Sequence, residues 1–181
     1  AEESEKYGKW CNEERPERAQ HPINCIDREQ AVAFCKWAGK RLPTEAEWEF
    51  AARGADGRMY PWGSEVDPDR ANYGETKVGS TSAVGCFPGG ASVYGCQDLS
   101  GNVWEWTRSA WDDYPYPDPG TDRTERESLA GGDKRFRVLR GGSFGYNHRL
   151  ARCASRLRSV PPYRLRTYGF RLVASPFHSE P

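Results

Sequence analysis

The chain has 181 residues, the size of a single domain, and its formal net charge of zero excludes long-range steering toward nucleic acid by the whole protein. No apolar run approaches the roughly 18 residues of a membrane-spanning helix, and we expect no signal peptide within these residues. With 19 glycines, 13 prolines and only 36% apolar residues, the sequence predicts a globular core rich in aromatic side chains and an unusual share of loop.

The six cysteines form no Cys-x-x-Cys pair, which excludes a zinc ribbon and a thioredoxin-type site. Cys86 and Cys96 flank a turn-rich loop that a disulfide could close, and Cys11 and Cys25 could pair likewise. The sequence leaves the redox compartment and these disulfides open. The other two cysteines are predicted to be small core residues: Cys35 and Cys153.

Residues 1–20 are polar and are expected to form an irregular arm, and the abrupt start of the chain is interpreted as a truncation that could have removed an upstream signal or strand. A first helix then follows the capping box that begins at Asp27 and includes Gln30, and Gly39 ends it. The residues predicted to lie on its buried face are Ala31, Phe34, Cys35 and Ala38.

A second helix is predicted after Pro43, with Thr44 as its N-cap and Glu47 at the third helical position. Gly54 ends it. Both helices are short and amphipathic, as expected if they pack on a sheet. The buried face of the second helix is predicted to carry Trp48, Ala51 and Ala52.

Turn residues dominate from residue 54 to 95 and again from 110 to 135, which predicts two long irregular segments. Strands with alternating faces are predicted at residues 137–140 and 170–173. Around the sequence Trp104-Glu105-Trp106, strand alternation places the two tryptophans on one face, and Val103 and Glu105 on the other.

Asp98 and Glu105, together with carbonyls between them, have the oxygen-ligand chemistry of a site for a hard cation such as Ca²⁺. The spacing is not that of an EF-hand. On the residues alone, a turn with two solvated carboxylates is therefore the competing interpretation.

The stretch from Gly145 to Tyr168 follows neither helical nor strand periodicity. It holds six arginines, no aspartate, and none of five residue types that occur elsewhere in the chain: Lys, Glu, Gln, Met and Trp. A solvated, arginine-rich loop closed by turn residues such as Pro161 and Pro162 also fits this pattern.

Five motifs occur here in one order: RLPTEAEWE from Arg41, YPWG from Tyr60, GNVWEW from Gly101, RGGSF from Arg140 and GFR from Gly169. Together they resemble the formylglycine-generating enzyme, or sulfatase-modifying factor, family over about residues 21–175. The resemblance implies an α+β, C-type-lectin-like fold, with two helices packed on small antiparallel sheets and much irregular loop. It divides the chain into an arm (residues 1–20), this domain (21–175) and a tail (176–181).

The resemblance also implies a structural calcium site. Its ligands would be the carboxylates of Asp98 and Glu105 and the carbonyls of Gly101 and Val103. A second calcium site of the family would begin near Asn72 and Tyr73. We expect that site to be absent, because its acidic ligand falls near two residues that cannot replace a carboxylate: Thr76 and Lys77.

The catalytic residues of the family do not carry over. Family enzymes use two copper-binding cysteines after the Gly-Gly-Ser motif, but here the first position falls at about Tyr146 and the segment with the second is deleted. Cys153 matches a non-catalytic family cysteine. The related sulfoxide synthases need a His-rich iron site, which the three histidines do not assemble by spacing. We therefore expect no copper and no oxidase activity.

Within this family, residues 144–168 resemble the variable region of proteins diversified by diversity-generating retroelements. Adenine-directed mutagenesis of AAY codons in that branch never yields Lys, Glu, Gln, Met or Trp. We call residues 144–168 the display segment. Its framework positions would be His148, Arg149, Arg152, Ala154, Arg156, Arg158, Pro161 and Arg164. Its ligand-binding, diversified positions would be Phe144, Gly145, Tyr146, Asn147, Leu150, Ala151, Ser155, Leu157, Ser159, Val160, Tyr163, Leu165, Thr167 and Tyr168.

The sequence thus predicts a non-enzymatic display protein that binds a protein or other macromolecule through rigid aromatic and small adaptable residues, with arginines tying the irregular backbone in place. The alternatives are an enzymatic or regulatory paralogue of the family, and an arginine-rich surface for nucleic acid, which the zero net charge disfavours. By resemblance we expect a soluble protein of prokaryotic or phage-type context. The ligand, the oligomeric state and the compartment are not predicted.

Overall fold

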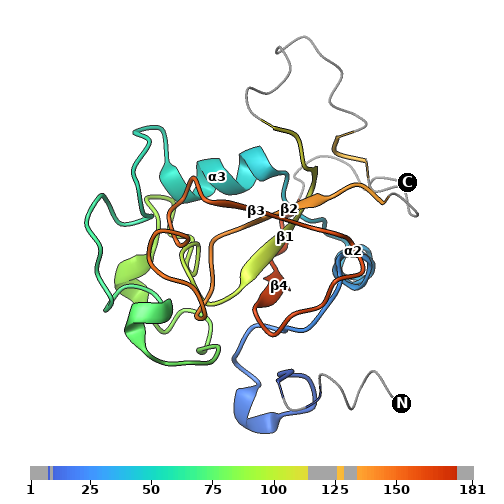
Figure 1. Cartoon of the computed structure of the whole chain (residues 1–181), viewed down its shortest axis with the longest axis horizontal. Helices are drawn as coiled ribbons and strands as arrows, with labels where there is room; N and C mark the ends of the chain where they lie inside the picture. The colour runs from blue at the N-terminus through green and yellow to red at the C-terminus, as the bar shows by residue number, and fades with distance from the viewer. Residues whose placement is uncertain (1–7, 9, 114–125, 129–133, 175–181) are drawn as a thin grey trace.

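The computed structural model of the chain describes residues 8, 10–113, 126–128 and 134–174 (Figure 1). Its α-helices are α2 (Arg28–Trp37) and α3 (Glu45–Arg53). Its 3-10 helices are η1 (Pro16–Arg18), η2 (Gly74–Thr76) and η3 (Pro88–Gly90). Its strands are β1 (Trp104–Ala110), β2 (Arg137–Arg140), β3 (Arg156–Ser159) and β4 (Tyr168–Phe170). Within the described part, no helix is long and apolar enough to cross a membrane.

The four strands form one small sheet in the order β3-β2-β1-β4, with β1 and β2 at its centre. The pairs β1–β2 and β2–β3 are antiparallel, as predicted, but β1 and β4 run parallel. The prediction of antiparallel sheets is therefore wrong for this pair. Parallel pairing needs a crossover connection, and residues 160–167 supply it, because they carry the chain from β3 at one edge of the sheet to β4 at the other.

Helix α2 begins at the predicted capping box. The Asp27 carboxylate accepts from the Gln30 backbone N–H at 2.8 Å, and the Gln30 side chain accepts from the Asp27 N–H at 3.1 Å. Ala31 and Cys35 are buried as predicted, but Phe34 is 46% exposed, so its predicted burial is wrong. The apolar stripe of α2 is narrow, and Phe34 lies beside it, edge-on to Phe170 at 5.7 Å between ring centroids.

Helix α3 confirms its predicted cap as well, because Thr44 and Glu47 form a reciprocal capping box. Trp48 and Ala52 are fully buried, and Gly54 ends the helix in a left-handed conformation with φ of 62°. In Figure 1, α3 lies along one side of the sheet and α2 at one end, while the loops of residues 54–103 gather at the other end.

Glu47 also predicts a pH dependence of stability. Its carboxylate takes a bidentate pair of hydrogen bonds from Arg41, and this contact lowers its pKa to about 2. Because the pKa is lower in the folded than in the unfolded chain, the stabilisation is present at neutral pH and is lost as pH falls from about 4.5 toward 2. In urea unfolding at stepped pH, Glu47→Gln should be less stable than the parent at pH 7. The difference should shrink at pH 2, and parallel curves would contradict the assignment.

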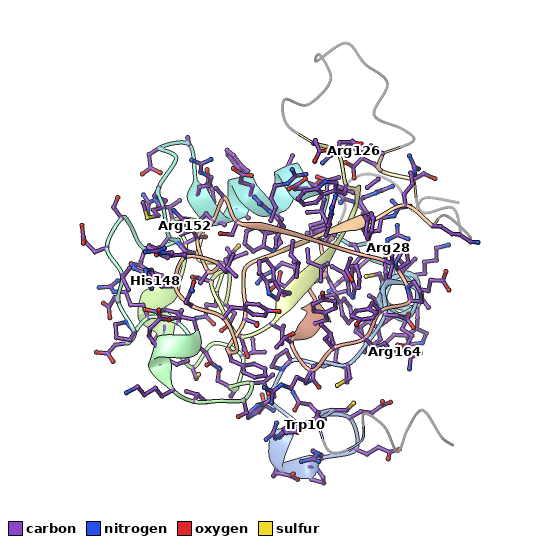
Figure 2. The ribbon with its side chains drawn as sticks, viewed as in Figure 1. Trp10, Arg28, Arg126, His148, Arg152 and Arg164 are labelled. Carbon is purple, nitrogen blue, oxygen red and sulfur yellow. The ribbon has the colours of Figure 1, made fainter. Side chains whose placement is uncertain are left out.

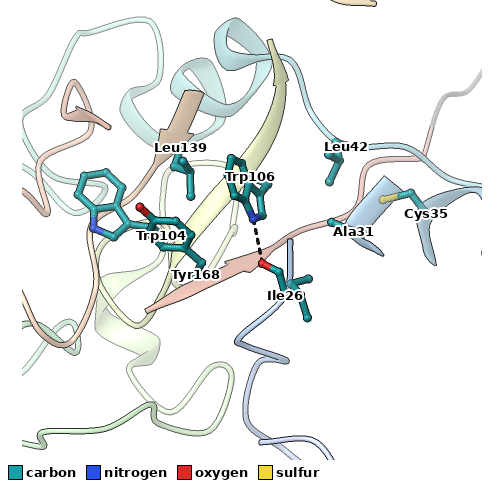
Figure 3. Packing of buried hydrophobic residues seen from close by; sticks show 8 residues of the cluster. All are labelled: Ile26, Ala31, Cys35, Leu42, Trp104, Trp106, Leu139 and Tyr168. Atoms are coloured by element: carbon teal, nitrogen blue, oxygen red, sulfur yellow. Dashed lines mark hydrogen bonds between the residues drawn. The ribbon is translucent and has the colours of Figure 1, made fainter. Parts of the chain in front are cut away.

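The largest buried cluster joins the centre of the sheet to α2 (Figure 3). Trp104 and Trp106 project from one face of β1, as their alternation predicted, and both are fully buried. The Trp106 indole N–H donates to the Ile26 carbonyl at 3.2 Å, and its ring meets Tyr168 edge-on. This cluster includes Leu139 of β2 and Tyr168 of β4, and it therefore fixes the strands at both ends of the display segment.

The predicted strand at residues 137–140 coincides with β2, but all four residues are buried rather than one face of them. The predicted strand at 170–173 begins two residues early, and only Val173 continues the pairing, through an isolated bridge to Arg41. Much of the predicted irregular segment at 110–135, and the tail at 176–181, lie outside the described residues.

Candidate functional site

Along the chain, the display segment follows β2 and leads into β4, and it contains β3. Figure 2 shows His148 and Arg152 on the loop-rich side of the molecule and Arg164 on the side of α2, so the segment spans the width of the sheet. Nine of its fourteen predicted ligand-binding residues have at least partly exposed side chains or backbone. The exposed ones are Gly145, Asn147, Leu150 and Tyr163, and the half-buried ones are Tyr146, Ser155, Leu157, Val160 and Leu165.

The other five predicted ligand-binding residues are buried, so their side chains do not face outward in this structure. The Phe144 ring lies beneath the Arg166 guanidinium, and Tyr168 packs against Trp106 in the core. Ser159 pairs with Arg137 in the sheet, Ala151 packs in a small cluster with Ala71 and Tyr73, and the Thr167 carbonyl accepts from the Trp104 N–H. The five buried residues are Phe144, Ala151, Ser159, Thr167 and Tyr168.

The burial of three leucines shows whether the display segment is ordinary hydrophobic core. Leu150 is 37% exposed, whereas Leu157 and Leu165 are half-buried and pack against the central cluster. Tyr146 behaves similarly, because its ring meets Trp104 edge-on at 6.0 Å. The three leucines are thus not buried together, and the segment has one side seated on the core and the other facing outward.

The arginines of the segment tie it to elements elsewhere in the chain, as predicted. Arg156 pairs with Glu45 at 2.5 Å, donates twice to the Asp112 carbonyl at 3.1 Å, and stacks over Trp111 at 4.1 Å. Arg164 pairs at 2.9 Å with Asp27, the N-cap of α2. Each contact joins the segment to a fixed helix or strand, so its irregular backbone is held from several sides.

Two further arginines of the display segment stack on aromatic rings. Arg158 lies over Trp111 and Phe136, and Arg166 lies over Trp10 and Phe144, with guanidinium carbon to ring-centroid distances of 4.8 to 5.8 Å. Stacking of this kind restrains a guanidinium without covering its edge. Arg166 therefore links the N-terminal arm to the first residue of the display segment.

Glu45, at the start of α3, is the anchor that the sequence did not reveal. It is 1% exposed, and its carboxylate meets Arg156 at 2.5 Å, Arg126 at 2.6 Å and Arg140 at 3.7 Å. Arg140 is also fully buried, pairs with Glu49 and donates to the carbonyls of residues 154 and 155. A glutamate in the first turn of a capped helix normally faces solvent, so no local signal marks it as the centre of three arginines.

At the opposite end of the segment, His148 pairs with Glu75 at 2.6 Å between Nδ1 and Oε1. Partial burial would raise the pKa of Glu75, but the hydrogen bonds from the His148 ring and backbone outweigh it and lower the pKa. The Tyr60 hydroxyl donates to the His148 carbonyl at 3.3 Å. The framework role predicted for His148 therefore has a geometric basis, whereas Arg149 and Arg152 are exposed.

Three of the predicted calcium ligands, Asp98, Gly101 and Val103, lie in the loop that enters β1, and the fourth, Glu105, lies in β1 itself. Asp98 accepts from the Gly85 N–H at 2.7 Å through one carboxylate oxygen. Glu105 is 4% exposed, and its carboxylate accepts from the Trp48 indole at 2.6 Å and from Arg171 at 2.5 and 2.6 Å. The oxygen donors suit a hard cation. Burial would lower the pKa of Arg171, but the charge and hydrogen bonds of Glu105 outweigh it and raise the pKa. A cation there would share Glu105 with Arg171.

Tyr146, which the resemblance places at about the position of the first family cysteine, packs on Trp104. Cys153 is fully buried beside Trp48, and burial raises its pKa to about 12, which disfavours a reactive thiolate. Among the described residues, no three His, Cys, Asp or Glu side chains gather into a metal site.

Comparison with known proteins places these features in context. Residues 2–176 match the sulfatase-modifying factor enzyme 1-like domain. The formylglycine-generating enzyme of Mus musculus is 34% identical over 192 residues, covering 93% of this chain and 50% of that protein. The inactive C-alpha-formylglycine-generating enzyme 2 of Bos taurus is 37% identical over 175 residues, covering 87% and 52%. The chain thus spans about half the length of these curated relatives.

Among solved structures, variable protein 1 of Treponema denticola superposes with a TM-score of 0.71, covering 86% of this chain and 71% of that one. At 24% identity this likeness speaks for the fold alone. The two helices, the small curled sheet and the long loops are those expected of a C-type-lectin-like domain of this kind.

Proposed function

The chain belongs to the family of sulfatase-modifying factor enzyme 1-like domains, and from this premise we propose that it is a non-enzymatic display protein whose display segment binds a macromolecular ligand. The proposal extends to its origin, which we infer to be diversification by a retroelement. Both named enzymes and inactive paralogues are among its relatives, so membership of the family is compatible with a loss of catalysis.

The observation that carries the proposal is a division of labour along the display segment. Arg156 and Arg164 pair with carboxylates of the scaffold, Glu45 and Asp27, and so fix the backbone of the segment. The residues between these anchors include the exposed Tyr163 and the half-buried Leu157 and Val160. A rigid frame with substitutable side chains between its anchors is the arrangement of a paratope.

The ligand-binding set supported by the geometry is smaller than the one predicted from sequence. It comprises the nine exposed or half-buried positions, and Tyr146 and Tyr163 supply its large aromatic contacts. Aromatic side chains of this kind give broad contact area at low entropic cost, which favours a protein as the ligand.

Two matched libraries test the proposal. One randomises the outward positions Asn147, Leu150, Ser155 and Tyr163, and the other randomises the buried positions Phe144, Ala151, Ser159 and Tyr168. Most members of the first library should remain protease-resistant and should yield binders when selected on a panel of purified proteins, because outward substitutions usually cost less than about 0.5 kcal/mol. Equal loss of folding in both libraries would refute the division of labour.

The diversification itself has a separate test in the source genome. A near-copy of the codons for residues 144–168, rich in adenine and beside a reverse transcriptase gene, should be present. Its absence would remove the retroelement origin while leaving the display surface to the library experiment.

We further propose that Asp98, Gly101, Val103 and Glu105 hold a structural calcium ion. Chelation should lower the melting temperature, because a ligand bound only by the folded chain stabilises it. Glu105→Ala also removes the partner of Arg171, so Asp98→Asn is the cleaner variant, and it should abolish the chelator effect. An unchanged melting curve with chelator, together with no calcium by elemental analysis, would sink the proposal.

The rival reading is an active paralogue of the formylglycine-generating enzyme. Because the first catalytic position falls at about Tyr146 and the segment of the second cysteine is deleted by resemblance, we predict no oxidation of a sulfatase-type cysteine peptide when copper is added. Mass spectrometry of the peptide is the readout. Formylglycine product at multiple turnovers would restore the enzymatic reading.

A further inference from the structure

The N-terminal arm brings two cysteine thiols together. The Asn12 backbone N–H donates to the Asn24 side-chain oxygen at 2.7 Å, and the Asn24 amide donates to the Trp10 carbonyl at 3.0 Å. These bonds place residues 10–12 against residue 24, with Cys11 and Cys25 beside them. The two side chains are within hydrogen-bonding contact of each other, and both cysteines are in the thiol form.

We propose that Cys11 and Cys25 are a disulfide-forming site that fastens the arm to residue 25, whose backbone is hydrogen-bonded to the display segment. The inference goes beyond the proposed function and does not depend on it. The pair would close a loop of 15 residues, counted from Cys11 to Cys25. A disulfide across such a loop stabilises a fold chiefly by restricting the unfolded chain.

The chemistry requires only a low-molecular-weight disulfide such as oxidised glutathione. Cys11 is half-buried and Cys25 is buried, so the Cys11 thiolate attacks first and displaces one glutathione thiolate. Burial raises the pKa of Cys25, so its thiol must first lose its proton to the solvent; the thiolate then attacks the Cys11 sulfur of the mixed disulfide and displaces the second glutathione thiolate. Two electrons pass from the cysteines to glutathione, and the two protons of the thiols end on the two glutathione molecules.

Contacts of the arm carry the effect to the display segment. The Cys25 N–H donates to the Leu165 carbonyl at 3.2 Å, and the Asn24 amide donates to the Arg166 carbonyl at 2.8 Å. Trp10 lies 4.8 Å beneath the Arg166 guanidinium. Locking Cys11 to Cys25 therefore restrains the backbone just before β4, where the display segment ends.

The experiment compares the chain equilibrated in oxidised and in reduced glutathione. Oxidation should remove two hydrogen masses, peptide mapping should join Cys11 to Cys25, and the melting temperature should rise by about 5–10 °C and fall again with dithiothreitol. Amide hydrogen exchange at Leu165 to Tyr168 should slow in the oxidised form, a readout that needs no ligand.

Three serine variants, at Cys11, Cys25 and Cys86, complete the test. Cys11→Ser and Cys25→Ser should each lose the mass change and the thermal shift, whereas Cys86→Ser should keep both. Mapping to Cys86 and Cys96 instead, a stable glutathione adduct at Cys11, or a linked pair with an unchanged melting temperature would each overturn the proposal. Serine is chosen at the buried Cys25 because it is close in size to cysteine, so the variant should still fold and the test stays decisive.

Discussion

Glu45→Ala should destabilise the protein by about 3–5 kcal/mol, since removal of one partner from a buried ion pair leaves the remaining charges uncompensated. Glu45 is 1% exposed and receives Arg126, Arg140 and Arg156 on one carboxylate. Without it, three guanidiniums lose their shared carboxylate; Arg140 keeps its pair with Glu49 and Arg126 its pair with Glu127, so the loss falls mainly on Arg156. Urea unfolding at pH 7, followed by tryptophan fluorescence, measures the loss.

Glu75→Ala is the matched control. Glu75 also pairs with the display segment, through His148, but its side chain is 42% exposed. Exposed pairs of this kind contribute about 0–1 kcal/mol. If the two glutamate variants lose similar stability, Glu45 is not the anchor of the segment.

Arg156→Ala should behave like Glu45→Ala, because it also leaves the Asp112 carbonyl without the two hydrogen bonds it receives. Combining the two substitutions should cost less than the sum of the single losses, by at least about 0.5 kcal/mol, as for any directly coupled pair. Strict additivity would show that Arg156 is held by the Trp111 ring rather than by Glu45.

Gly142→Ala should cost about 2–5 kcal/mol, from left-handed backbone strain and from overpacking together. Gly142 has φ of 76°, and a Cβ there would lie 2.7 Å from the Leu150 carbonyl oxygen and 2.8 Å from the Ala151 Cα. Both obstacles are backbone of the display segment, so the loop of residues 145–152 would have to move. The readouts are urea unfolding and protease sensitivity of that loop.

Gly145→Ala, three residues later, is the control. Its Cβ would meet only the Thr167 methyl group at 3.6 Å, an ordinary van der Waals distance. We expect a change within about 0.5 kcal/mol. Comparing the two variants shows whether Gly142, the second glycine of the Gly-Gly-Ser motif, is needed for close backbone packing. Gly145 is only one of the exposed positions.

Local chemistry predicted the helices well. The capping boxes at Asp27 and Thr44 satisfy backbone donors within four residues, so their signals are contained in the sequence itself. Strand alternation likewise placed Trp104 and Trp106 on the core face of β1. The predicted burial of Phe34 was wrong, because periodicity gives the direction of a side chain but not how much of it the neighbouring elements cover.

Long-range features escaped prediction for a related reason. The parallel pairing of β4 with β1 depends on the path of residues 141–167, and the burial of Glu45 depends on arginines 81 to 111 positions away. Within the display segment, the composition identified the region, but it could not tell outward positions from inward ones. Phe144 and Tyr168 lie at its two ends, where β2 and β4 draw the chain into the core.

The pairing of the last strand with the first also limits how this protein can change over time. Residue 168 pairs with residue 104 between β4 and β1, and residue 156 of the display segment pairs with residue 140 of β2. Replacing side chains between these points leaves the length of the closed loop unchanged, and with it the entropy of closing the loop. One residue inserted or deleted within β3 or β4 would shift the strand register and turn core side chains outward. Substitution at constant length leaves both registers unchanged, so it is the change of this surface that disturbs the sheet least.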